Sequence, residues 1–227
     1  MKYLFVVAHP DDEVLGAGGM IYNLIQKHND VSLCFMCSDA EARKNTLNEI
    51  SIRQQAINCA KSLEISKDNL IFGSFPNIKM NTIPHLELVQ FIESAMLKSQ
   101  PDVVVTHYKN DLNSDHKRTS ECCDEAIRLF QRNNSVKEIK KYMYMEVLSS
   151  TDWVPNDCFC PNYFYEINKN GVEAKIRALS FYDGSLREYP HSRSKETIEA
   201  LAKLRGSQAK LDHAEAFIVA FERHKNE

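Results

Sequence analysis

The chain of 227 residues contains 43% hydrophobic and 26% charged residues and has a formal net charge of −3. This composition is typical of a globular protein with a sizeable core and argues against a disordered chain. A net charge this small argues against a polyanion such as nucleic acid as the partner. Because α/β folds of this length commonly form one unit, we expect a single domain over residues 1–227.

Apolar runs alternate with amphipathic segments along the first part of the chain. The runs are typical of strands buried on both faces of a parallel sheet. The predicted strands lie at residues 3–8, 31–37, 69–72 and 103–106. Helical spacing of apolar residues predicts helices at residues 13–28, 43–63, 84–99 and 115–131. This alternation predicts a Rossmann-like, doubly wound α/β fold whose mostly parallel sheet is flanked by helices.

The pattern loosens after the fourth predicted helix. Residues 142–148 alternate aromatic residues or Met with other residues, which predicts a fifth strand, and residues 163–167 predict a short sixth. The stretch 151–161 is predicted to be a loop, and residues 172–182 and 195–204 are predicted to be helices. We expect these C-terminal segments to form loop-rich elements that cap the sheet.

Two polar clusters each follow a predicted strand. The first, AHPDDE, occupies residues 8–13, and the second, THYKNDLNSDH, occupies residues 106–116. Ligands of open parallel sheets bind beyond the carboxyl ends of the strands. We therefore expect both clusters to face one crevice.

The residue types in these clusters are those of a zinc site. Catalytic zinc commonly takes three imidazole or carboxylate ligands from the protein and leaves a fourth position for water. His9 and Asp12 can present both kinds of ligand from one tight loop stiffened by Pro10. The third ligand would then be His107 or His116.

A His-x-x-Asp turn alone is more commonly a hydrogen-bonded turn than a metal site, so other features have to support the zinc hypothesis. Asp11, Asp12 and Glu13 are consecutive, and their repulsion is costly unless a cation or a helix N-terminus offsets it. In addition, Asp111 or Asp115 could hold a ligating histidine from its far side. These features favour a metal.

The two clusters resemble motifs of the LmbE-like (PIG-L-type) family of zinc-dependent N-acetylglucosamine deacetylases. Residues 8–13 match its AHPDDE signature, and residues 106–116 are similar to its second motif. Further similar segments follow in the family's order, at Arg53 and at residues 101–102, 149–153, 190–194 and 214–217. The resemblance thus extends over essentially the whole chain.

The resemblance implies an enzyme that hydrolyses a linear amide bond, removing an N-acyl group such as acetyl from an amino sugar or sugar conjugate. It implies that His9, Asp12 and His116 bind Zn²⁺, or Fe²⁺ in the cell, and that Asp11 is the general base. Because Asp11 would not be a metal ligand, it could take a proton from the attacking water and return it to the leaving amine.

One position departs from the family pattern. The second motif commonly reads His-Pro-Asp-His, whereas residues 113–116 read NSDH. An asparagine can donate a hydrogen bond but carries no charge, so stabilisation of the oxyanion could fall to Asn113, His107 or His191. Arg53 matches a family position that contacts the substrate.

Three alternatives remain open. Gly16, Gly18 and Gly19 could indicate a dinucleotide site, but their spacing does not fit G-x-G-x-x-G, and close packing of the first helix explains them better. A non-catalytic binding protein of the same fold is the second, although retention of Asp11 favours an enzyme. A deformylase or amidase acting on a non-sugar N-acyl substrate is the third.

Nothing in the sequence indicates export or membrane insertion. The apolar run within residues 1–8 is too short for a signal peptide, and no window reaches the length of a membrane span. The seven cysteines are odd in number and lack a repeated Cys-x-x-Cys pair, as expected for reduced thiols. We expect a cytoplasmic protein without a membrane anchor that binds a small N-acylated sugar or sugar conjugate. Whether it forms a homo-oligomer stays open.

Overall fold

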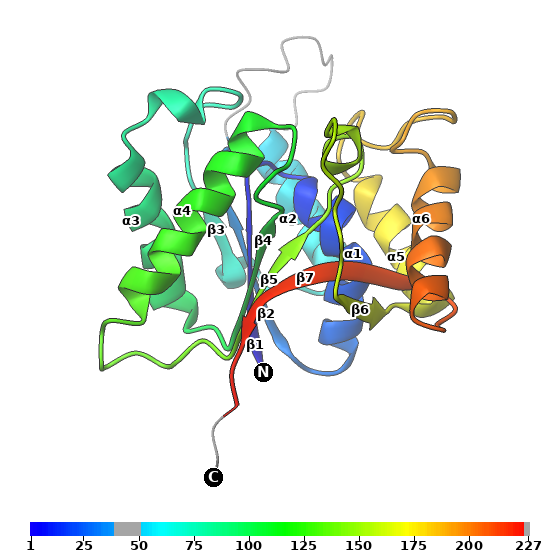
Figure 1. The fold of residues 1–227 in the computed structure, drawn as a ribbon. Helices are drawn as coiled ribbons and strands as arrows, with labels where there is room; N and C mark the ends of the chain where they lie inside the picture. The colour runs from blue at the N-terminus through cyan, green and yellow to red at the C-terminus, as the bar shows by residue number, and fades with distance from the viewer. Residues whose placement is uncertain (39–50, 225–227) are drawn as a thin grey trace.

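A seven-stranded sheet, in the order β3-β2-β1-β4-β5-β7-β6, forms the centre of the computed structural model, which describes residues 1–38 and 51–224. Helices cover both faces of this sheet (Figure 1). The strands are β1 (Lys2–Val7), β2 (Asp30–Phe35), β3 (Leu70–Phe72), β4 (Val103–His107), β5 (Lys141–Met145), β6 (Tyr163–Glu166) and β7 (Ala214–Glu222). The α-helices are α1 (Asp12–Gln26), α2 (Ile52–Ser62), α3 (His85–Ser99), α4 (Ser114–Phe130), α5 (Asn168–Leu179) and α6 (Lys195–Gln208). Short 3₁₀-helices are η1 (Lys67–Asn69), η2 (Met80–Thr82) and η3 (Thr151–Trp153).

The five strands β1 to β5 pair in parallel, and β7 runs antiparallel to both β5 and β6. Side chains of a strand alternate between the two faces. Phe5 and Val7 accordingly belong to the core shared with α1 and α2, whereas Leu4 and Val6 belong to the core shared with α3 and α4 (Figure 1). The predicted doubly wound, mostly parallel sheet is confirmed. No α-helix among residues 1–38 and 51–224 has the length and apolarity needed to cross a membrane.

The structure differs most from the predicted elements at β7 and β5. The longest strand, β7, occupies Ala214–Glu222, where no element was predicted. The predicted strand over residues 142–148 ends earlier, because β5 stops at Met145. The first residues of the predicted helix over 43–63, up to residue 50, lie outside the described residues, and the rest forms α2.

Helix α1 is held close to the sheet by contacts from the C-terminal elements. A Cβ atom on Gly16 would lie 2.5 Å from Met145 Sδ and 3.1 Å from the Glu146 carbonyl oxygen, so a larger residue would have to displace its neighbours. Ala17 breaks the helical backbone, and the buried Glu215 carboxylate of β7 accepts the N–H of Gly19 at 3.0 Å. The glycines are thus explained by close packing, as the sequence indicated, and they fix the helix whose first turn carries the acidic cluster.

Candidate metal centre

The two polar clusters meet beyond the carboxyl ends of β1 and β4, which are neighbours in the sheet. Asp12 Oδ2 lies 3.2 Å from His9 Nδ1 and 3.2 Å from His116 Nε2. The three residues offer ligand atoms that all lie within 4.8 Å of one another. A single cation could therefore contact one atom from each of these side chains.

A separate carboxylate stands at the far ring nitrogen of each histidine. His9 Nε2 donates to Asp115 Oδ2 at 3.0 Å, and His116 Nδ1 lies 3.2 Å from Asp111 Oδ1. Both aspartates are almost completely buried. Because carboxylates at this position fix the tautomer of a ligating imidazole, each ring keeps its other nitrogen directed at Asp12.

The two supporting carboxylates are themselves held in place. Asp111 accepts hydrogen bonds from the hydroxyl groups of Ser150 and Thr151, and from the backbone N–H of Asn113 at 2.8 Å. Asp115 lies in the first turn of α4, and its backbone N–H donates to the Asn113 side chain at 2.8 Å. The helix cap and the histidine supports thus form one connected network.

His9, Asp12 and His116 shift one another's pKa values. Burial alone would lower the pKa of His9, but hydrogen bonds with Asp115 and Asp12 raise it well above its usual value. Burial also opposes protonation of His116, yet Asp12 and Asp111 raise its pKa to about 9. Burial favours protonation of Asp12, but the charge of His116 holds its pKa well below the usual value. The cluster therefore attracts positive charge, and two imidazoles with one carboxylate are a donor set that suits zinc.

His107, the other histidine proposed as the third ligand, lies behind this cluster. Its Nε2 accepts the backbone N–H of Ala8 at 2.8 Å, and its ring stacks on His116 with centroids 4.0 Å apart. Burial lowers the pKa of His107 to about 3, so the ring is neutral. Both rings approach Asp12 Oδ2, His116 Nε2 at 3.2 Å and His107 Nε2 at 3.6 Å. Because the N–H of Ala8 already occupies Nε2 of His107, His116 is the better candidate for the third ligand.

A second group of ligand atoms, from His9, Cys37 and Asp115, also lies within 4.8 Å. Asp115 is already engaged there, because it accepts the backbone N–H groups of Ile78 at 2.5 Å and Met80 at 3.2 Å. Burial raises the pKa of the Cys37 thiol, which disfavours the thiolate that binds metal. The group with Asp12 and His116 is the better match to a catalytic zinc site.

Asp11 stands beside the cluster but belongs to neither ligand group. Its backbone has a left-handed φ of 113°. Its Oδ2 accepts hydrogen bonds from Ser185 Oγ at 2.6 Å and Arg193 Nη1 at 3.0 Å. Arg193 is anchored in turn by its Nε, which donates to Ser149 Oγ at 2.5 Å. Ser185 was not among the predicted site residues, whereas Arg193 lies in the segment 190–194 that resembles the family.

Glu13 supports the same turn from inside the core. Its Oε2 accepts the backbone N–H of Asp11 at 3.0 Å, and its Oε1 accepts the Tyr182 hydroxyl at 2.5 Å. Complete burial raises the pKa of Glu13 to about 8. The three consecutive acids therefore have different surroundings: Asp12 meets three histidines, Asp11 meets a serine and an arginine, and Glu13 meets a tyrosine.

These groups open into a cavity of about 370 Å³. It is lined by His9, Asp11, Asp12, Asn77, Ile78, Leu112, Asn113, His116, Ser149, Ser150 and Arg193. The floor is thus polar, and Ile78 and Leu112 add apolar surface. A cavity of this size is in the range of small-molecule sites.

The remaining predicted site residues are Asn113, Arg53 and His191. Asn113 lines the cavity, and because its Oδ1 caps α4, its side-chain amide N–H groups are the part that can meet a ligand. Arg53 is exposed, outside the cavity lining, and lies over the Phe72 ring at 4.6 Å. His191 is also exposed outside the lining, and its Nδ1 accepts the N–H of Arg193 at 3.0 Å. Neither Arg53 nor His191 is brought together with the cluster.

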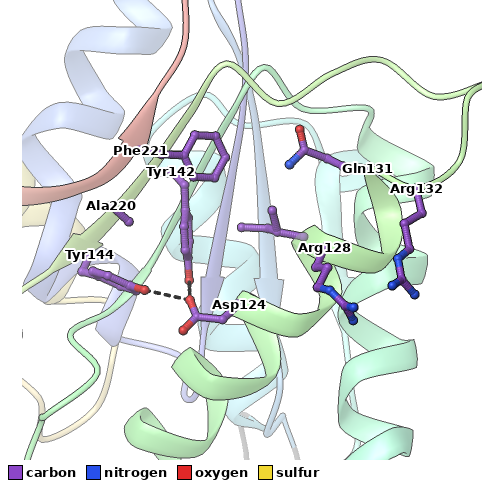
Figure 2. Close-up of a pocket in the computed structure, with 9 residues that line it drawn as sticks. Asp124, Arg128, Gln131, Arg132, Tyr142, Tyr144, Ala220 and Phe221 are labelled. Carbon is purple, nitrogen blue, oxygen red and sulfur yellow. Dashed lines mark hydrogen bonds between the residues drawn. The ribbon is translucent and has the colours of Figure 1, made fainter.

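A second hollow, of about 470 Å³, lies between α4 and the strands β5 and β7 (Figure 2). Its carboxylate, Asp124, accepts the hydroxyl groups of Tyr142 and Tyr144, each at 2.7 Å. No histidine or cysteine is among the described residues that line it. The larger hollow therefore lacks the donor set of the metal centre.

Replacing Asp111 with asparagine should weaken zinc binding by about 10- to 100-fold, because the amide no longer holds a charged support against His116. Competition with a coloured zinc chelator measures this affinity. The matched control, Asp68→Asn, changes an exposed aspartate of η1 and should leave the affinity unchanged. Equal affinities for the wild type and Asp111→Asn would contradict the proposed support.

Comparisons with known proteins agree with this architecture. Residues 4–127 match the family described as PIG-L: GlcNAc-PI de-N-acetylase. The N,N'-diacetylchitobiose deacetylase of Pyrococcus horikoshii is 19% identical, with a TM-score of 0.74 over 96% of this chain and 83% of its own. The 4-carboxy-2-hydroxymuconate hydratase GalB of Pseudomonas putida is 20% identical, with a TM-score of 0.76 over 100% of this chain and 99% of its own. The zinc-inhibited form of teicoplanin deacetylase Orf2 is 14% identical, with a TM-score of 0.75 over 100% of both chains. Because the similar structures include a hydratase as well as deacetylases, the fold alone does not determine the reaction.

Proposed function

Because the chain belongs to the PIG-L (LmbE-like) family, we propose that it is a zinc-dependent hydrolase that removes an N-acyl group from an amino sugar or sugar conjugate. Acetyl is the acyl group in the description of the family, and the substrate would be a small molecule. The single chain of residues 1–227 would carry the whole site.

One observation carries the proposal. Both histidines turn one ring nitrogen to Asp12, while a separate buried carboxylate stands at the other nitrogen. This is the arrangement of a zinc site with outer carboxylates, in which a bound ion would replace the proton between each ring and Asp12. His9, Asp12 and His116 would hold the metal. Zinc bound there would polarise the amide carbonyl of the substrate and activate a water molecule for attack.

Asp11 would provide the proton transfers. It lines the cavity and is no part of the ligand group, so its carboxylate is available as a base. It would accept a proton from the attacking water and donate that proton to the nitrogen as the C–N bond breaks, leaving a carboxylate and a free amine. Ser185 and Arg193 hold Asp11 at the position where both transfers occur.

Arg193 would also stabilise the oxyanion that forms when the carbonyl is attacked. Its Nη1 and Nε bind Asp11 and Ser149, which fixes a charged donor at the cavity wall. The Asn113 amide, on the opposite loop, is the second donor near the site. A preorganised donor is worth about 10²- to 10³-fold in kcat, which would offset the missing histidine of the second motif.

Replacing Arg193 with alanine should therefore lower kcat by about 10²- to 10³-fold while zinc stays bound. Steady-state amine release and zinc content, measured on the same preparation, separate the two effects. Arg177→Ala is the matched control, because this exposed arginine of α5 lies outside the cavity lining. A control that loses as much activity as Arg193→Ala would contradict the assignment.

The function itself is tested by a substrate panel with release of free amine as the signal. The panel contains N-acetylglucosamine, its nucleotide-linked and lipid-linked forms, the N-formyl analogue and a non-sugar N-acetyl amine. We expect zinc-dependent amine release from at least one N-acylated amino sugar, faster than from the non-sugar amine. Release from none of them by the zinc-loaded protein would overturn the proposal and favour a non-catalytic binding protein.

A further inference from the structure

Two large apolar side chains are exposed at the mouth of the cavity that holds the metal centre. Ile78 is 57% exposed and Leu112 is 50% exposed, and both line the cavity. Single exposed hydrophobic residues are ordinary on a protein surface. Two of them at the mouth of one cavity, beside a polar floor, form a surface that an apolar group could cover. We call Ile78 and Leu112 the apolar lip.

The backbone of Ile78 has a conformation that its side chain disfavours. Its φ of 58° is in the left-handed region, where β-branched residues are rare. Asparagine and glycine adopt this conformation more readily. The N–H of Ile78 donates to Asp115 Oδ2 at 2.5 Å, and the same carboxylate accepts from His9 Nε2 at 3.0 Å. Asp115, which contacts His9, therefore also holds the backbone of Ile78 in place. Strained residues of this kind cluster at functional sites.

Leu112 is tied to the metal centre through its two neighbours in the chain, Asp111 and Asn113. It lies between Asp111, which stands beside His116, and Asn113, which caps α4. The N–H of Asn113 donates to Asp111 Oδ1 at 2.8 Å, so the backbone on the C-terminal side of Leu112 is tied to that carboxylate. Both members of the lip are thus attached to the carboxylates that orient the two histidines. Their position relative to His9 and His116 is set by the same network.

We propose that the substrate carries an apolar group next to the amide that is cleaved, and that Ile78 and Leu112 bind this group. This inference rests on the proposed function and narrows its substrate class to N-acylated amino sugars with an alkyl or aryl substituent. The substituent is either the acyl chain or the aglycone of the sugar. In both cases the apolar lip is covered when the amide reaches the floor, and Ile78 acts as a specificity residue.

Two substrate series test the proposal and separate the two sources of the apolar group. One series lengthens the acyl chain of glucosamine from acetyl to butanoyl and hexanoyl. The other keeps acetyl and lengthens the aglycone from methyl to butyl and hexyl. Burial of one methylene is worth up to about fourfold in binding. We expect kcat/KM to rise about two- to fourfold per methylene in one series, mainly through a lower KM.

The variant Ile78→Asn should abolish this dependence on chain length. Because asparagine accommodates the left-handed backbone, the variant should unfold at the same temperature as the wild type or a higher one. A residue with only a structural role would not combine a flat chain-length profile with an unchanged or raised Tm. Leu86→Asn is the matched control, since Leu86 is 60% exposed on α3 and outside the cavity lining, and it should keep the dependence.

The outcomes distinguish this inference from the proposed function. Hydrolysis of the parent N-acetyl sugar with a flat or falling profile in both series would overturn the apolar lip and leave the hydrolase intact. An equally steep profile in Ile78→Asn and the wild type would also overturn it. No hydrolysis of any member of either series would overturn both.

Discussion

Replacing Asp11 with asparagine should lower kcat for amine release by about 10²- to 10⁴-fold and leave the zinc content at the wild-type level. An amide cannot accept the proton of the attacking water, so the transfer to the leaving amine is lost as well. Asparagine keeps an oxygen that can accept from Ser185 and Arg193, so the turn should keep its shape. Single-turnover rates and zinc content on one preparation check both parts.

Glu13→Gln is the companion measurement for this prediction. Glu13 lies next to the same turn, and its Oε2 accepts the backbone N–H of Asp11. Glu13→Gln should lower activity less than Asp11→Asn does, because the Glu13 substitution shifts the turn that carries Asp11 but leaves the Asp11 carboxylate in place. Near wild-type turnover by Asp11→Asn, with zinc bound, would contradict the role of Asp11 as the base.

Replacing His116 with glutamine or alanine should remove zinc and activity together. The loss of a ligand should weaken zinc binding by more than the roughly 10- to 100-fold expected for the loss of an outer carboxylate. Alanine leaves the buried Asp12 without one of its histidine partners and could unfold the chain, whereas glutamine keeps a polar group there. Zinc content by emission spectrometry, with circular dichroism as the test of folding, measures the effect.

His224→Ala is the matched control for this second prediction, because it removes an exposed histidine far along the chain from the metal centre. It should keep both zinc and activity. A folded His116→Gln protein that binds zinc as tightly as the wild type would contradict the ligand set.

Much of the fold follows from local patterns. The buried parallel strands and the helices between them have regular periods, so their types are predictable and only their ends shift. Strand β7 is different, because Ala214–Glu222 mixes alanine and glutamate, which favour helices, with apolar residues. Its conformation depends on pairing with β5 and β6 on either side. Such long-range pairing leaves little trace in the segment itself.

The metal cluster was predictable because its residues occupy two short segments at the ends of adjacent strands. The spacing left both His107 and His116 open as the third ligand. Both rings approach Asp12, but the N–H of Ala8 occupies Nε2 of His107, which favours His116. The partners of Asp11 were not predictable in this way. Ser185 and Arg193 are 174 and 182 residues away along the chain, and such a contact has no local signature.

The most direct test of the central claim is a zinc titration of the chelator-treated protein, with amine release from the fastest substrate of the panel as the signal. Zinc dependence through His9, Asp12 and His116 predicts no release without metal, a rise to a plateau at about one zinc per chain, and no recovery in His116→Gln. Full activity of the metal-free chain, or one bound zinc with no amine released from any substrate, would contradict the account.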